Sequence, residues 1–140
     1  MPARTKLISV VVALAVACLA GNVLAAKKCK PGSTCSCVGS NDCSFVCEGE
    51  GCKFTSMGSG DLKIDCAKGK CKISLMGSGD ASIDCKAGGC KVSSKGSGDA
   101  VMDCPGKKCK MSCLGSGDCT VKNCPDCKMS CLGTGSCNKK

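Results

Sequence analysis

Apolar and polar side chains alternate with a period of two in short stretches of this chain. Residues 81–85 read Ala-Ser-Ile-Asp-Cys and residues 90–94 read Cys-Lys-Val-Ser-Ser, so small or apolar side chains occupy every second position. This alternation is typical of β-strands that bury one face. Glycine and small polar residues fill the stretches between them, as turns require. We therefore predict two short strands and two turns in residues 77–95.

The same pair of strands recurs every nineteen residues. Each unit opens on a Gly-Ser turn and reads approximately GSGDxx(I/V)DCxxxxCKxSxx. A period of this length, kept over residues 39–132, predicts either a solenoid or a meander of hairpins. The turns begin at Gly39, Gly58, Gly77, Gly96 and Gly115, and an eighteen-residue step leads to a sixth turn at Gly133.

Aligning the units on this period produces two apolar rows. We interpret them as the only substantial apolar rows of the chain, which must therefore face each other inside the fold. The seventh position of the unit gives Phe45, Ile64, Ile83, Met102 and Val121, and the sixteenth gives Phe54, Ile73, Val92, Met111 and Met129.

The cysteines sort into pairs by their spacing. Removal of Cys18 with an N-terminal segment leaves eighteen of the 19 cysteines, an even number and a very high density for an exported chain. Four pairs have CxxxxC spacing, one has CxxC spacing, and four enclose five residues. The hypothesis is nine disulfides: Cys29 with Cys35, Cys37 with Cys43, Cys47 with Cys52, Cys66 with Cys71, Cys85 with Cys90, Cys104 with Cys109, Cys113 with Cys119, Cys124 with Cys127, and Cys131 with Cys137.

Disulfide geometry favours the solenoid over the meander. Packed sheets lie about 10 Å apart, whereas bridged Cα atoms lie within about 7 Å, so the bridges belong at turns where two sheets converge. We therefore predict an all-β, disulfide-stapled, flattened β-solenoid of nineteen-residue coils. The alternative, an antiparallel β-meander of hairpins, leaves its apolar face uncovered. It would set Asp65, Asp84 and Asp103 opposite Lys72, Lys91 and Lys110.

The first 26 residues have the features of an export signal. A basic head with Arg4 and Lys6 precedes an apolar run and a small-residue end at Ala26. Cys18 is an alternative cleavage and lipidation site, because residues 14–18 resemble a bacterial lipoprotein box. No later segment is apolar enough to span a bilayer. We predict a secreted, periplasmic or cell-envelope protein with an N-terminal cap at 27–38, a five-unit repeat domain at 39–132 and a C-terminal cap at 133–140.

Composition excludes most catalytic sites. The chain has no histidine, tryptophan or tyrosine and has two phenylalanines. Without imidazole no side chain shuttles protons near neutral pH, and without aromatic walls a flavin, haem or base-stacking site is excluded. We therefore predict that the protein is not an enzyme.

Positive charge comes almost wholly from lysine, within a formal net charge of +9. An outward column of lysines on a rigid sheet could hold an anionic glycan, lipopolysaccharide or nucleic acid, without sequence-specific recognition of the nucleic acid. The alternative is that these lysines only keep exposed strands soluble and discourage edge pairing. The column comprises Lys53, Lys72, Lys91, Lys110 and Lys128.

Two groups of residues are candidates for metal ions. Asp61, Asp80, Asp99 and Asp118 recur in the Gly-Ser turns, where they would stack at about 4.8 Å and repel one another. Calcium bound between coils would relieve this repulsion, and the alternative is that each Asp caps amides of its own turn. Cysteine richness without aromatic side chains also resembles metallothioneins, which makes an exported metal-thiolate protein an alternative function.

The GSxD units with valine and isoleucine strands resemble a bacterial exported repeat family of unknown function, whose repeats carry GSxN. The resemblance covers residues 39–137 and implies a β-solenoid and no activity. This chain differs in carrying Asp for Asn and in its cysteine columns. We predict an exported, non-catalytic, disulfide-rich repeat protein with a structural, adhesive or surface-binding role. Its partner is unknown, with an anionic polysaccharide or an envelope surface as candidates.

Overall fold

The computed structural model describes residues 25–140. Most of the expected export signal at 1–26, and with it Cys18, lies outside the described residues. Within residues 25–140, no helix is long and apolar enough to cross a membrane.

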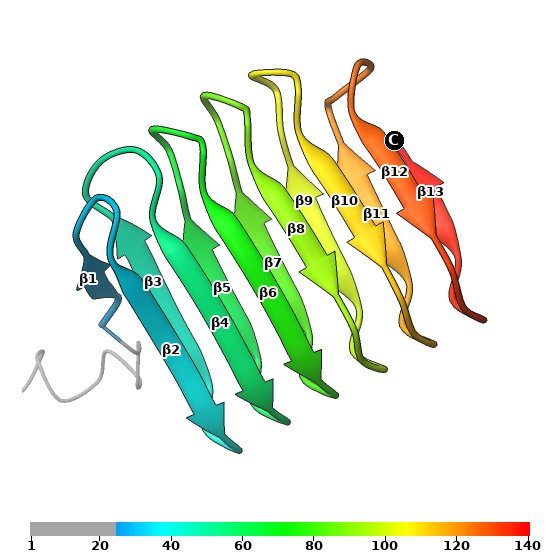
Figure 1. Cartoon of the computed structure of the whole chain (residues 1–140), viewed down its shortest axis with the longest axis horizontal. Coiled ribbons are helices and arrows are strands. Elements are labelled where there is room, and N and C mark those ends of the chain that lie inside the picture. The colour runs from blue at the N-terminus through cyan, green and yellow to red at the C-terminus, as the bar shows by residue number, and fades with distance from the viewer. Residues whose placement is uncertain (1–24) are drawn as a thin grey trace, which may run out of the picture.

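The strands form two sheets that lie face to face (Figure 1). Successive strands alternate between the sheets, because each coil contributes one strand to each sheet and a turn at each margin. The seven-stranded sheet contains β1 (Lys27–Cys29), β3 (Cys43–Cys47), β5 (Leu62–Asp65), β7 (Ala81–Asp84), β9 (Ala100–Asp103), β11 (Cys119–Lys122) and β13 (Cys137–Lys139). The six-stranded sheet contains β2 (Thr34–Gly39), β4 (Lys53–Gly58), β6 (Lys72–Gly77), β8 (Lys91–Ser94), β10 (Lys110–Cys113) and β12 (Lys128–Cys131).

Neighbouring strands pair in parallel, one repeat apart. Ile64 of β5 pairs with Ile83 of β7, and Ile73 of β6 pairs with Val92 of β8. The predicted flattened solenoid is therefore confirmed, and the alternative antiparallel meander is wrong. Asp65, Asp84 and Asp103 pair with one another along the seven-stranded sheet and do not face lysines across hairpins. The two-sheet solenoid is more stable than a single-sheet meander because each apolar row then covers the other.

The core lies between the sheets and consists of the two predicted apolar rows, the disulfide sulfurs, and buried leucine and alanine side chains near the Gly-Ser turns, namely Leu62, Leu75, Ala81 and Ala100. The side chains of both rows are buried except Met129, which is partly buried in the last coil. Phe45 and Phe54 come from opposite sheets, and their ring centroids lie 5.7 Å apart. The expectation that these are the only substantial apolar rows is wrong, because a third row lies on the surface.

Disulfides close both margins of the coil. The structure joins the cysteines of residues 25–140 in the nine pairs that the spacing assigns, with Cα atoms 5.4 to 6.6 Å apart. Every described coil has a bridge at the margin opposite the Gly-Ser turns. At the Gly-Ser margin, the bridges occur only near the ends, as Cys37–Cys43, Cys113–Cys119 and Cys131–Cys137. The central coils, which are packed on both sides, have serine, leucine or alanine at these positions.

Glycine in the Gly-Ser turns is required by the approach of the preceding coil. A Cβ atom on Gly79 would lie 2.0 Å from the carbonyl oxygen of Gly60. Asn41 occupies the same repeat position in the first described Gly-Ser turn, and within the described residues no earlier turn of this kind lies against it. A side chain is therefore tolerated at Asn41, in the first described turn of the stack.

Candidate binding surface

Five of the predicted lysines form one continuous column on the outer face of the six-stranded sheet. Their side chains are exposed, and the strands pair so that each lysine lies beside the next, about 4.8 Å away. The column follows Lys53, Lys72, Lys91, Lys110 and Lys128, with Thr34 at its N-terminal end. None of these five lysines belongs to an ion pair within residues 25–140.

Small hydroxyl side chains form a second column beside the lysines, two residues further along each strand. A shallow depression of about 320 Å³ lies over β4, β6 and β8, and lysines and hydroxyl residues line it. The edges of Phe54, Ile73 and Val92 also contribute to its lining. The column comprises Ser36, Thr55, Ser74, Ser93, Ser112 and Ser130.

A third column on the same face is apolar and was missed in the sequence. It occupies the last position of the unit, next to the Gly-Ser turns, and it is interrupted once by Lys95. The sequence contains the signal for this column, because these residues lie an even number of positions from the lysines along each strand and therefore point outward with them. The exposed fractions are 66% for Val38, 45% for Met57, 40% for Met76, 39% for Leu114 and 68% for Leu132.

Carboxylates gather on the opposite sheet. No Asp or Glu occurs in the strands of the six-stranded sheet. Asp65, Asp84 and Asp103 form an outward column on the seven-stranded sheet, where the Oδ1 atoms of Asp65 and Asp84 are enclosed and have no hydrogen-bond partner. The turn aspartates Asp42, Asp61 and Asp80 line a hollow on this side together with Asp65. The face of the six-stranded sheet is therefore basic, whereas the strands of the seven-stranded sheet carry these aspartates together with lysines, namely Lys27, Lys28, Lys63, Lys122 and Lys139.

The turn aspartates form a ladder between coils. The backbone N–H of Asp80 donates a hydrogen bond to Oδ1 of Asp61 at 2.9 Å, and the N–H of Asp99 donates to Oδ1 of Asp80 at 2.8 Å. The same bond links Asp118 to Asp99 at 2.7 Å. The expected cap within each turn is therefore wrong, because the carboxylate oxygen serves the following coil. Calcium at Asp61, Asp80, Asp99 and Asp118 stays a prediction.

Asp80→Ala is expected to destabilise the fold by about 1 kcal/mol, because the N–H of Asp99 loses its acceptor. Asp80→Asn keeps the acceptor and removes one charge from the row, so it should equal or exceed the wild type in stability. Ser136→Ala is the matched control, since Ser136 stands at the same turn position and its side chain accepts no hydrogen bond from another coil within residues 25–140. Urea denaturation followed by circular dichroism measures all three. An Asp80→Ala midpoint equal to that of Ser136→Ala would contradict the ladder.

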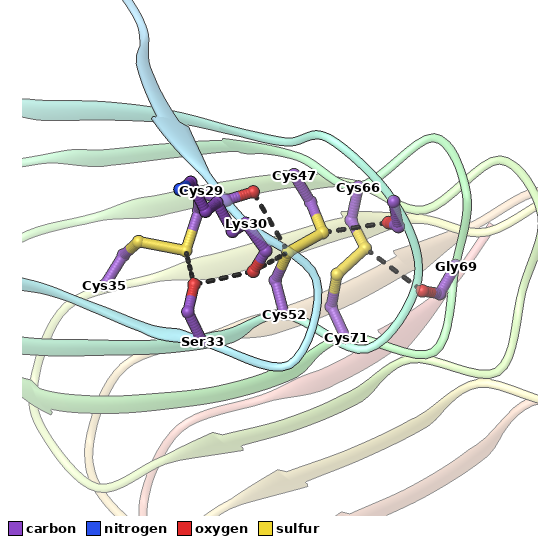
Figure 2. Close-up of a disulfide and its surroundings, with 10 residues drawn as sticks. Cys29, Lys30, Ser33, Cys35, Cys47, Cys52, Cys66, Gly69 and Cys71 are labelled. Carbon is purple, nitrogen blue, oxygen red and sulfur yellow. Dashed lines mark hydrogen bonds between the residues drawn. A yellow bond between two sulfur atoms is a disulfide. The ribbon is translucent and has the colours of Figure 1, made fainter.

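Sulfur atoms of neighbouring coils stack along the other margin. Figure 2 shows the bridges of three coils side by side, near Lys30, Ser33 and Gly69. Sulfur atoms of Cys47, Cys66 and Cys71 lie within 4.8 Å of one another, as metal ligands would. All three are in disulfides, so the structure offers no thiolates there, and a metal-thiolate store would first require reduction.

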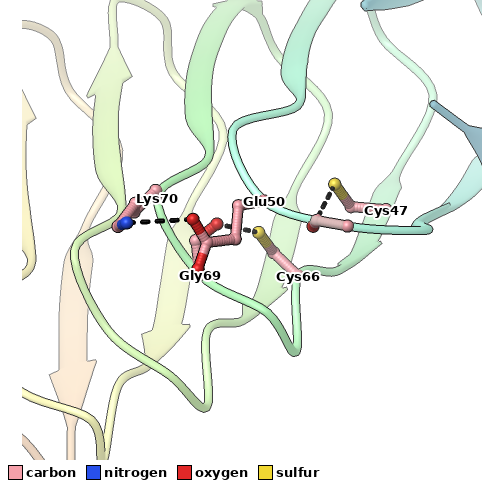
Figure 3. Close-up of polar contacts among 6 residues, drawn as sticks. Cys47, Glu50, Cys66, Gly69 and Lys70 are labelled. Atoms are coloured by element: carbon pink, nitrogen blue, oxygen red, sulfur yellow. Dashed lines mark hydrogen bonds and ion pairs between the residues drawn. The ribbon is translucent and has the colours of Figure 1, made fainter. Parts of the chain in front are cut away.

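Exposed charges join adjacent turns at this margin. Nζ of Lys70 lies 2.9 Å from Oε2 of Glu50 in the preceding coil (Figure 3). Both side chains are more than half exposed, at 69% and 59%. An ion pair this exposed contributes little stability. The stacking at this margin therefore depends on the bridges and the backbone, not on these charges.

The fold and its surfaces define a rigid β-solenoid, stapled by disulfides, with a flat basic face. Residues 22–136 match the family described as "Putative auto-transporter adhesin, head GIN domain" (DUF2807), and the chain belongs to this family. Searches of curated proteins and of solved structures returned no match. The expected family resemblance is thus confirmed as far as an adhesin-like β-solenoid family. The matching family is not a catalytic one, and together with the disulfides it indicates an extracytoplasmic location.

Proposed function

We propose that this chain is a non-catalytic adhesion domain that contacts an anionic surface through its lysine column. The observation that carries the proposal is the uniform positive charge of the six-stranded sheet. Five lysines stand in register on a sheet whose strands contain no carboxylate, while the strands of the other sheet carry both aspartates and lysines. A face with charge of one sign orients the molecule with that face toward an anionic partner.

Repulsion within the column also supports an anionic partner. Like charges at directly paired strand positions destabilise a sheet. Lys72, for example, is paired with Lys53 on one side and with Lys91 on the other. The acidic residues cannot relieve this repulsion, because the two sheets separate them from it by about 10 Å. An anionic partner relieves the repulsion and gains contact with five charges at once.

The proposal includes export of the chain, which places the lysine column outside the cytoplasm. We propose that residues 1–26 are an export signal, which is either cleaved near Ala26 or cleaved and lipidated at Cys18. Residues 27–38 and 133–140 are retained as caps of the repeat domain. Their strands β1, β2 and β13 continue the two sheets, and bridges close them. Mass spectrometry of the exported protein distinguishes a chain that begins at Lys27 from one that is acylated at Cys18.

Neutralising three lysines of the column is expected to weaken binding to an anionic surface about 100-fold, at about 1 kcal/mol per lysine. The variant is Lys72→Gln, Lys91→Gln and Lys110→Gln, measured by sedimentation with dextran sulfate beads in low salt. The matched control replaces Lys63, Lys68 and Lys122, which are exposed outside this face, and removes the same charge. Binding that falls equally in both variants would show a dependence on net charge alone and would contradict the proposal.

A further inference from the structure

We infer that the anionic surface is a lipid bilayer, on which the six-stranded sheet lies flat. Its apolar column inserts among the headgroups and its lysine column contacts lipid phosphates. This inference rests on the proposed function and names the class of surface. The inference is drawn from the third, apolar column on the basic face. Binding to a polar polyanion would leave this column without a role.

The apolar column recurs from coil to coil along the surface and is interrupted at Lys95. Val38, Met57 and Met76 are paired directly between β2, β4 and β6. Leu114 and Leu132 follow the paired residues Cys113 and Cys131, and backbone hydrogen bonds extend the ladder to them. Side chains of this kind, gathered in one row and left 39 to 68% exposed, mark an interaction surface rather than scattered exposure.

The composition of the face fits lipid better than sugar. Methionine and leucine gain free energy by leaving water for acyl chains and gain little from a hydrated polysaccharide. Lysine stems can follow the apolar surface while their ammonium groups remain among the phosphates.

The geometry allows both columns to act together. The apolar residue follows the lysine of its coil at the fourth position, as Met57 follows Lys53, which corresponds to about 13 Å along the strand. A flat face therefore brings a lysine and an apolar side chain of the same coil to one interface, except in the coil of Lys91, where Lys95 replaces the apolar residue. Asp65, Asp84 and Asp103 remain on the far side of the solenoid, about 10 Å from the bilayer. Basic residues with an apolar neighbour are the combination that binds anionic membrane surfaces.

A second copy of the chain is a poorer occupant of this face. Face-to-face pairing would bring two lysine columns into one interface, and the face carries no carboxylate to pair with them. Desolvating lysines without partners opposes such a dimer. The charge of the face thus favours an anionic lipid over self-association.

The experiment uses the oxidised, exported protein with vesicles of phosphatidylcholine containing 30% phosphatidylglycerol by design, with pure phosphatidylcholine vesicles, and with dextran sulfate beads. Met57→Ser, Met76→Ser and Leu114→Ser are combined in one variant of the apolar column. The matched control combines Val46→Ser and Val101→Ser on the outer face of the opposite sheet. Circular dichroism and intact mass verify that each variant is folded and oxidised.

The apolar-column variant is expected to bind anionic vesicles about 30-fold more weakly than wild type while binding dextran sulfate equally. The control should bind both like wild type, and phosphatidylcholine alone should bind weakly. Two results would overturn the inference and leave the proposed function standing. One is full vesicle binding by the apolar-column variant, and the other is wild-type binding to dextran sulfate without binding to vesicles. Wild-type protein that binds neither would overturn the proposed function as well.

Discussion

Gly79→Ala is expected to destabilise the solenoid by about 3 kcal/mol or more. The new Cβ would lie 2.0 Å from the carbonyl oxygen of Gly60 and 2.6 Å from its carbonyl carbon, both of which are backbone atoms. A flexible side chain could move aside, but this contact yields only if the two coils separate. Separation would break the hydrogen bonds that join them, including the Asp80-to-Asp61 bond.

Asn41→Ala is the matched control for this substitution, because the same repeat position already carries a Cβ there. It should change stability by no more than about 0.5 kcal/mol, as surface substitutions usually do. Thermal and urea melts followed by circular dichroism, under oxidising conditions, measure both variants. Equal midpoints for Gly79→Ala and Asn41→Ala would contradict the backbone contact between coils.

Reduction of the disulfides is expected to unfold the protein completely. Each bridge closes a short loop of three to six residues' separation, and such a bridge contributes about 2 kcal/mol by restricting the unfolded chain. Nine bridges of this size exceed the net stability of 5–15 kcal/mol that is usual for a domain. The core that remains has few large side chains and cannot replace them.

The measurement is circular dichroism and cooperative melting before and after treatment with a dithiol reductant, with alkylation and intact mass to count thiols. Cys131→Ser with Cys137→Ser removes a bridge in which Cys137 is exposed and Cys131 is only partly buried, and it should leave a folded protein. Cys85→Ser with Cys90→Ser removes a bridge whose two residues are 0% exposed and buries two hydroxyl groups, so it should cost more. A fully reduced chain that keeps a cooperative melt would contradict the dependence on disulfides.

The expected effects of Gly79→Ala and of disulfide reduction also bear on function, because the binding face is held in shape by the stacked coils themselves. Its columns are flat and in register only while each coil stacks on the last. Loss of stacking at Gly79 would separate Met76 and Lys72 from the coils before them. We therefore expect binding to follow stability in these variants, in contrast to the surface variants, which should bind differently at unchanged stability.

Much of the fold was predictable from the sequence because every level of the pattern has the same period. A nineteen-residue repeat fixes which residues stack, as with Ile64, Ile83 and Met102. Strand parity then decides which rows point inward, and the limited span of a disulfide places cysteines at the margins. The lysine column was predictable for the same reason, since parity places Lys72 and Lys91 on the outside.

The partner of the Asp carboxylate was not predictable from this pattern. An Asp in a Gly-Ser turn can reach amides of its own turn or of a neighbouring coil, and local sequence is the same in both cases. Only the close stacking of coils brings the N–H of Asp99 to Asp80. One feature of the sequence agrees with the bond between coils, because the sixth Gly-Ser turn has Ser136 where the five before it have Asp.

By itself, the sequence determined the length of the coil, the inward rows and the margins that carry cysteine, because these depend on period and parity. Tertiary structure alone decided on which side of the molecule each of the two strands of a unit places its outward columns. Lys72 and Met76 lie on one sheet and Asp84 on the other because the chain turns twice within each coil, and the geometry of those turns sets the relation between strands. A period in sequence relates residues of the same column, whereas the placement of the lysine and apolar columns on one side and of Asp65, Asp84 and Asp103 on the other requires the closed coil.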